Sequence, residues 1–191
     1  MSEHGHGQRF NPDKAGKLLD PNRRQLISPD TVMDLLGLGR DDIVAELGAG
    51  NGYFTVPIAA HTDKTVYAVD IEPKMLELLK EHASIDNVDN IKYIESSLER
   101  IPIQEGEIEK ILIAFVIHEV PDRIKVYHEL NRVRKLGGKI VILEWQAVKS
   151  EMGPPLHERI PSGEMKKELE ENGFQVEILD LNEKIYAALI Q

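Results

Sequence analysis

The chain has 191 residues, which suits one domain with a sizeable core and leaves little room for a second. It contains no cysteine, which excludes disulfides, thiolate metal ligands and cysteine nucleophiles and is typical of proteins in a reducing cytoplasm. Its formal net charge of −10 disfavours nucleic acid, and no apolar run approaches the ~20 residues of a membrane-spanning helix. We therefore expect a cytoplasmic protein, without nucleic-acid or membrane partners, that acts on a small molecule.

The first 28 residues are polar and irregular. We interpret residues 1–28 as an N-terminal arm, either a lid over a ligand or a tail, with one short helix near residues 13–19. Two histidines in this arm, His4 and His6, would bind Cu²⁺ or Ni²⁺ only adventitiously, so we predict no functional metal site. Residues 29–191 are expected to form a single domain.

A helix is predicted to begin with Ser28 as its N-terminal cap and Pro29 at its first position, and to end near Gly37. After it, strand-like apolar runs alternate with segments whose apolar residues recur at helical spacing. The predicted strands cover residues 43–47, 65–69, 91–94, 110–117, 139–145, 174–179 and 184–190. The predicted helices cover residues 54–60 and 73–82, a segment from Val126 that Gly137–Gly138 ends, and a last segment that Ser162 caps and Gly173 ends.

This alternation predicts the fold class. Strands that alternate with helices, without repeats or a low-complexity linker, are typical of a doubly wound α/β domain with a mostly parallel sheet, here of seven strands. Only residues 180–183 separate the last two strands, so we expect a hairpin to close the chain, with an antiparallel last strand.

The most informative stretch is the glycine-rich loop from Gly48 to Tyr53, after the first strand. Its glycines allow tight turns and let a ligand approach the backbone amides. The dinucleotide fingerprint requires a glycine at the sixth position, where this chain has Tyr53. Glu46 lies two residues before the loop, where an anion opposes a pyrophosphate but suits an ammonium or sulfonium group. The loop therefore leaves a nicotinamide-dependent oxidoreductase as the weaker alternative.

An acidic residue, Asp70, ends the second predicted strand, 18 residues after Gly52. An acid in this place typically accepts hydrogen bonds from ribose hydroxyls. The competing interpretation is a helix cap before Pro73. Ribose together with a cationic amino-acid end, which Glu46 would favour, describes S-adenosylmethionine better than NAD or ATP.

The sequence resembles the class I S-adenosylmethionine-dependent methyltransferases, especially the small-molecule group that is similar to the enzymes of ubiquinone and menaquinone biosynthesis. Five segments between residues 43 and 145 carry the resemblance: Val44–Gly52, Tyr67–Leu76, Leu98–Pro102, Ile113–Val120 and Val133–Lys139. Two positions depart from the family pattern. Glu46 replaces the commoner Asp, and Ser97 stands where the family usually has Asp, although its hydroxyl is still able to accept a hydrogen bond from the adenine amino group.

The resemblance implies a Rossmann-like fold, S-adenosylmethionine as cofactor, S-adenosylhomocysteine as product and a small-molecule methyl acceptor. It leaves open whether the chain forms a homodimer. The cofactor-binding residues that it implies are Glu46, Gly48, Ala49, Gly50, Gly52, Tyr53, Asp70, Ile71, Met75, Ser97, Leu98, Ala114 and Phe115.

Methyl transfer from a sulfonium is an in-line displacement that alignment and water exclusion promote, and it needs a general base only when the nucleophile must lose a proton. The candidate bases are His118, Glu119, Glu144 and His157. We select His118, because it follows the fourth strand at the carboxyl end of the sheet, although it would serve equally as a residue that shapes the pocket. A module that binds the cofactor without transferring its methyl group therefore remains an alternative.

After the fifth predicted strand, Met152–Pro155 is expected to form a stiff loop over the pocket. Trp145, at the end of that strand, is interpreted as pocket wall or core.

Overall fold

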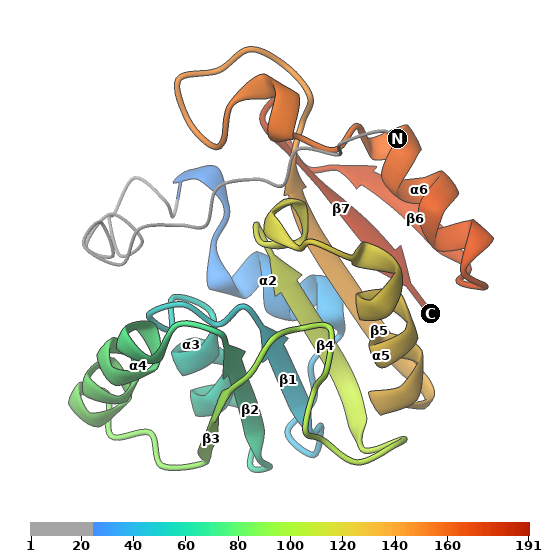
Figure 1. Ribbon diagram of the computed structural model, residues 1–191. Coiled ribbons are helices and arrows are strands. Elements are labelled where there is room, and N and C mark those ends of the chain that lie inside the picture. Colours follow the sequence, from blue (N-terminus) through green and yellow to red (C-terminus); the bar gives the residue numbers. More distant parts are fainter. Residues whose placement is uncertain (1–24) are drawn as a thin grey trace.

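Residues 25–191, which the computed structural model describes, form a seven-stranded sheet with helices on both faces (Figure 1). The strands are β1 (Val44–Leu47), β2 (Val66–Asp70), β3 (Ile91–Glu95), β4 (Ile108–Ala114), β5 (Arg134–Trp145), β6 (Val176–Asp180) and β7 (Ile185–Ile190). Their order is β3-β2-β1-β4-β5-β7-β6, and β7 runs antiparallel to both of its neighbours. The predicted fold class, a mostly parallel doubly wound sheet with an antiparallel last strand, is confirmed.

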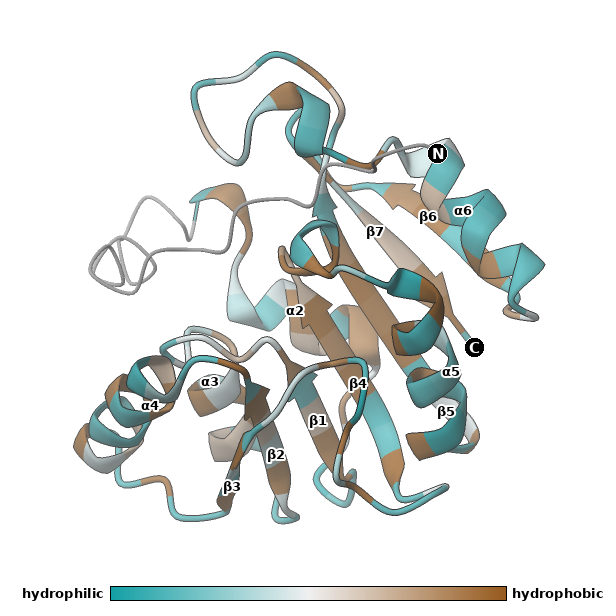
Figure 2. Ribbon diagram, in the orientation of Figure 1, coloured by the Kyte–Doolittle hydropathy of each residue, from teal (hydrophilic) through white to brown (hydrophobic). Residues whose placement is uncertain are grey.

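Each face of the sheet has its own apolar core. The helices are α2 (Pro29–Leu36), α3 (Thr55–His61), α4 (Pro73–Ile85), α5 (Arg123–Val133) and α6 (Ser162–Glu171), with short 3₁₀ turns η2 (Ile117–Glu119) and η3 (Leu156–Glu158). One core joins the sheet to α5 and α6, and the other joins it to α2, α3 and α4. Because both of its faces are covered, β4 is apolar over most of its length, as its brown colour in Figure 2 shows, with a hydrophilic stretch only near its start.

The chain reverses its direction across the sheet at β1. From β1 it builds β2 and β3 on one side, then returns to place β4 on the other side. In an open α/β sheet, ligands bind outside the carboxyl ends of the strands at such a switch point. The residues that follow β1, β2 and β4 are therefore the first place to look for a site.

The predicted start of the first helix is confirmed in detail. The Ser28 side chain accepts a hydrogen bond from the Thr31 N–H at 3.1 Å, and Gly37 adopts a left-handed φ of 59°. The predicted short helix near 13–19, the arm as lid or tail, and the histidines His4 and His6 lie outside the described residues. None of the helices in the described part of the chain could cross a membrane.

Several predicted boundaries are wrong. The fifth strand begins at Arg134 and not at Lys139, because Arg134 already pairs with Ile108 of β4, so the Gly137–Gly138 pair lies inside the strand. The fourth strand ends at Ala114 and not at residue 117, because Phe115 turns to a left-handed φ of 60°.

Two further errors concern α6 and the strand after it. Ser162 is the first residue of this helix and does not cap it, since Pro161 occupies the cap position without a side-chain hydrogen bond. The following strand also begins later than predicted. Phe174 bonds through its N–H to the Leu169 carbonyl and closes the helix, so β6 begins at Val176.

Candidate functional site

The glycine loop leaves the sheet at the end of β1 and is tied to β2. The N–H groups of Gly48 and Ala49 both donate to the Val69 carbonyl, at 2.8 and 3.0 Å. Gly48, Gly50 and Gly52 have φ angles of 82°, 54° and 90°, which residues other than glycine rarely adopt. The loop therefore has a shape that depends on its glycines, as the sequence predicted.

Two of these glycines are also required for close packing within the protein. A Cβ atom on Gly48 would lie 2.6 Å from Cγ1 of Val116, and one on Gly52 would lie 2.8 Å from Cγ of Leu79. The sequence interpretation assigned the glycines to ligand approach and missed this packing. Gly52 thus allows the loop to pack closely against Leu79 of α4.

Glu46 is buried in β1, with 2% of its surface exposed. Its Oε2 accepts a hydrogen bond from the Thr55 hydroxyl at the start of α3. The carboxylate thus lies beneath the glycine loop, between the strand before the loop and the helix after it.

Asp70 is the last residue of β2 and connects the glycine loop to the residue before α4. Its Oδ2 accepts from the Gly50 N–H at 2.8 Å, and its Oδ1 accepts from the Glu72 N–H at 2.9 Å. Burial raises the pKa of Asp70, while the hydrogen bonds from the Glu72 and Gly50 amides oppose that rise. One carboxylate oxygen thus binds the glycine loop, and the other binds the N–H of Glu72, which occupies the cap position of α4. The contact between Asp70 and ribose hydroxyls stays a prediction.

The other predicted cofactor residues lie in two settings. Met75, Leu98, Ala114 and Ala49 are buried, whereas Ile71, directly after Asp70, exposes 43% of its surface.

Three predicted residues make contacts with the protein that the sequence did not indicate. The Tyr53 hydroxyl donates to the Ile27 carbonyl at 2.9 Å, and the Ser97 hydroxyl accepts from the Glu99 N–H at 3.2 Å. The Phe115 ring lies 5.1 Å from the Trp145 ring, centroid to centroid.

His118 and Glu144 form a buried pair between the ends of β4 and β5. His118 Nδ1 lies 2.8 Å from Glu144 Oε1, and the side chains expose 4% and 0% of their surfaces. Burial acts to lower the pKa of His118, but the hydrogen bond and charge of Glu144, with the charges of Glu119 and Glu158, outweigh it and raise this pKa. The structure thus pairs two of the four predicted bases.

The two remaining candidates differ. Glu119 Oε1 lies 3.8 Å from the Nε2 atom of His118, so it belongs to the same cluster. His157 has 80% of its side chain exposed and contacts only its neighbour Glu158 among the ion pairs of the described residues, at 3.7 Å. His157 thus lies on an exposed turn and takes no part in the buried pair of His118 and Glu144.

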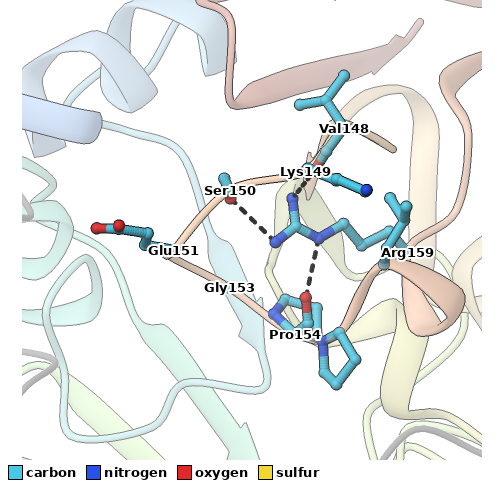
Figure 3. Close-up of a pocket in the computed structure, with 9 residues that line it drawn as sticks. Val148, Lys149, Ser150, Glu151, Gly153, Pro154 and Arg159 are labelled. Carbon is cyan, nitrogen blue, oxygen red and sulfur yellow. Dashed lines mark hydrogen bonds between the residues drawn. The ribbon is translucent and has the colours of Figure 1, made fainter.

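The chain after β5 folds back on itself around Arg159, which the sequence interpretation missed. Figure 3 shows this guanidinium in the middle of residues 148–154, where it bonds to backbone and side-chain oxygens of the loop. The loop and Arg159 line a hollow of about 640 Å³.

Trp145 is core and not open wall, since it exposes 9% of its surface and packs with the apolar cluster of α2 and α3.

A model of the family described as "Methyltransferase domain" matches residues 45–142, which include the glycine loop, Asp70 and the His118 turn. The chain belongs to the class I S-adenosylmethionine-dependent methyltransferases. S-adenosylmethionine is accordingly its cofactor and S-adenosylhomocysteine the product, and the nicotinamide alternative is wrong.

The matches to individual proteins agree with this family. The chain is 30% identical over 117 residues to the ubiquinone/menaquinone biosynthesis C-methyltransferase UbiE of Escherichia coli, a match that covers 59% of the chain and 46% of the relative. The chain thus spans about half the length of the curated relatives it matches. A SAM-dependent methyltransferase from Aquifex aeolicus has a TM-score of 0.90 at 26% identity, covering 95% of this chain and 98% of the other. The DhpI–SAH complex shares the fold, with a TM-score of 0.74 at 15% identity over 94% and 92% of the two chains.

Proposed function

We propose that this chain transfers a methyl group from S-adenosylmethionine to a small-molecule acceptor in the cytoplasm. When bound, the cofactor supplies a methyl group on a positively charged sulfur. The observation that carries the proposal is the buried His118–Glu144 pair, which lies at the carboxyl edge of the sheet beside the predicted cofactor residues Ala114 and Phe115.

The residues at the glycine loop fit the cofactor. Each Asp70 oxygen accepts one backbone hydrogen bond, and an ionised carboxylate has about four acceptor positions, so two stay available for the ribose hydroxyls. Ile71 offers an exposed apolar surface for the adenine ring. Glu46 provides negative charge beneath the loop for the cationic amino-acid end.

We assign the remaining cofactor contacts to the residues that surround this loop and the ends of β3 and β4. These are Gly48, Ala49, Gly50, Gly52, Tyr53, Met75, Ser97, Leu98, Ala114 and Phe115.

His118 is the proposed general base. Its Nδ1 atom is held by Glu144, so in the neutral ring Nδ1 carries the proton and Nε2 is the basic nitrogen. Glu144 acts as a positioning residue that fixes the tautomer and orientation of the ring. An acceptor hydroxyl or amine would give its proton to Nε2 as the new bond forms.

A small acceptor fits the chain better than a macromolecular one. The net charge of −10 repels nucleic acid. The relative from Escherichia coli is named for ubiquinone and menaquinone biosynthesis, and we extend from it only the expectation that the acceptor is small.

Transfer of labelled methyl groups tests this proposal. The full chain is incubated with tritiated S-adenosylmethionine and a panel of phenols, amines, quinols and thiols, and the label is then counted separately in small molecules and in macromolecules. We expect label in the small-molecule fraction only. Label in protein or RNA would refute the acceptor class, and cofactor binding without any transfer would support the non-catalytic module.

A further inference from the structure

The guanidinium of Arg159 is buried, and all of its N–H donors form hydrogen bonds within the protein. The residue exposes 6% of its surface. Its Nε donates to the Pro154 carbonyl, and its terminal nitrogens donate to three further carbonyls and to the Ser150 hydroxyl, at distances of 2.6 to 3.2 Å. The three further carbonyls belong to Gln146, Val148 and Met152. Because a guanidinium has five N–H donors, none is left over for a substrate.

No carboxylate forms an ion pair with Arg159 within residues 25–191. The acceptors are neutral oxygens of one loop, residues 146–154, and burial lowers the pKa of Arg159, opposed by the charge of Glu144. A buried cation is tolerated only where hydrogen bonds replace its hydration. The loop must therefore keep its closed shape for as long as Arg159 stays buried.

This loop is pressed against Trp145. A Cβ atom on Gly153, whose φ is 85°, would lie 2.6 Å from Cδ2 of the indole. Arg159 Cζ lies 5.8 Å from the centroid of the indole ring, and Phe115 packs against the same ring. The backbone N–H of Trp145 also donates to Glu144 Oε2 at 3.0 Å. The loop therefore packs on a residue that is bonded directly to Glu144, the proposed positioning carboxylate.

We propose that Arg159 is a positioning residue for the methyl acceptor. It holds loop 146–154 closed against Trp145, so that the loop keeps the shape of the hollow that it lines, and it does so without touching the acceptor. The inference rests on the proposed function, because it needs an acceptor at this edge. It assigns no role to Arg159 in binding the cofactor, since the glycine loop and Asp70 lie on the other side of β4 in the sheet order.

Replacing Arg159 with Met tests the inference. Trp145 is the only tryptophan in the chain, so its fluorescence reports on the loop directly. We expect a red-shifted emission that acrylamide quenches more strongly, an acceptor KM that rises roughly tenfold to hundredfold, and an unchanged affinity for S-adenosylhomocysteine in calorimetry.

A second variant guards against misfolding of the first. Gly153→Ala would force a Cβ atom into the indole while Arg159 stays in place. Its matched control is Gly173→Ala, because Gly173 has a φ of 86° and nothing within 4 Å of the added Cβ atom. We expect the red shift and the higher acceptor KM in Gly153→Ala only.

The outcomes separate the inference from the proposed function. Unchanged Trp145 emission in Arg159→Met and Gly153→Ala would overturn the inference, and so would an equal loss of cofactor affinity and acceptor affinity. If the wild-type chain transfers no methyl group, the proposed function fails. The fluorescence result then still shows whether Arg159 holds the loop on Trp145, but the assignment to an acceptor is lost with the function.

Discussion

His118 and Glu144 were both visible in the sequence as candidate bases, but their pairing was not. Each follows or ends a predicted strand, and parallel strands bring such positions to one edge. The register of β4 against β5 and the turn at Phe115 decide that these two meet. His157 could not be distinguished from His118 by residue type, but it lies on an exposed 3₁₀ turn.

The His118 pair predicts how transfer depends on pH. Glu144, Glu119 and Glu158 outweigh the effect of burial and raise the pKa of His118 above its ordinary value of about 6.5. A base is active when neutral, so for an acceptor that must lose a proton the rate rises with pH through this raised pKa. The measurement is the pH profile of kcat/KM, and His118→Gln should lose that rise and about 10²–10⁴-fold in rate.

A profile of His118→Gln that keeps the same inflection would show that another group titrates. Glu144→Gln is the companion variant. It removes the charge that favours the imidazolium, so the inflection should move to lower pH while the rise itself remains.

The role of Arg159 could not be predicted from the sequence. The loop sequence carries no motif or periodicity that marks this arginine, and its partners are mostly backbone carbonyls. Such carbonyls converge only after the loop has closed. Their positions are therefore a property of the fold and not of the residue types.

At the scale of elements, apolar runs and helical spacing located all seven strands and the main helices of the described chain. The errors lie at boundaries where tertiary pairing overrides local preference. Gly137–Gly138 would normally end a helix, yet α5 ends four residues earlier and the pair joins β5, because β4 offers a strand edge to pair with.

The packing of the glycine loop on α4 gives a prediction for stability. Gly52→Ala adds a Cβ atom 2.8 Å from Leu79 Cγ and 3.2 Å from Val56 Cγ2, at a φ of 90°. We expect a loss of about 2–5 kcal/mol in the free energy of unfolding, from overpacking together with left-handed backbone strain. Urea unfolding measures it.

The matched variant for this measurement is Gly137→Ala. Gly137 has a φ of 78° and nothing within 4 Å of an added Cβ atom, so it carries the backbone strain alone, about 1–2 kcal/mol. Equal losses in the two variants would show that contact with Leu79 contributes nothing.

At the scale of the whole molecule, the reversal of strand order at β1 gathers the functional residues at one edge. The sequence could predict this arrangement because alternating strands and helices permit few connections.

The net negative charge is also a property of the whole molecule, and it gives a prediction about nucleic acid. We expect no binding of a short fluorescent RNA or DNA by anisotropy even at about 50 mM salt, where phosphate contacts are strongest. Salt-sensitive binding would reopen a nucleic-acid acceptor.

Calorimetric titration of S-adenosylhomocysteine into the full chain tests the central claim most directly, with Asp70→Asn as the informative variant and the exposed Asp89→Asn as its control. We predict one binding site in the wild type and in Asp89→Asn, and a loss in Asp70→Asn of about 1–3 kcal/mol, roughly 5- to 150-fold in affinity. Absence of binding up to millimolar ligand, or equal affinity in all three chains, would contradict the assignment of Asp70 and the glycine loop to the cofactor.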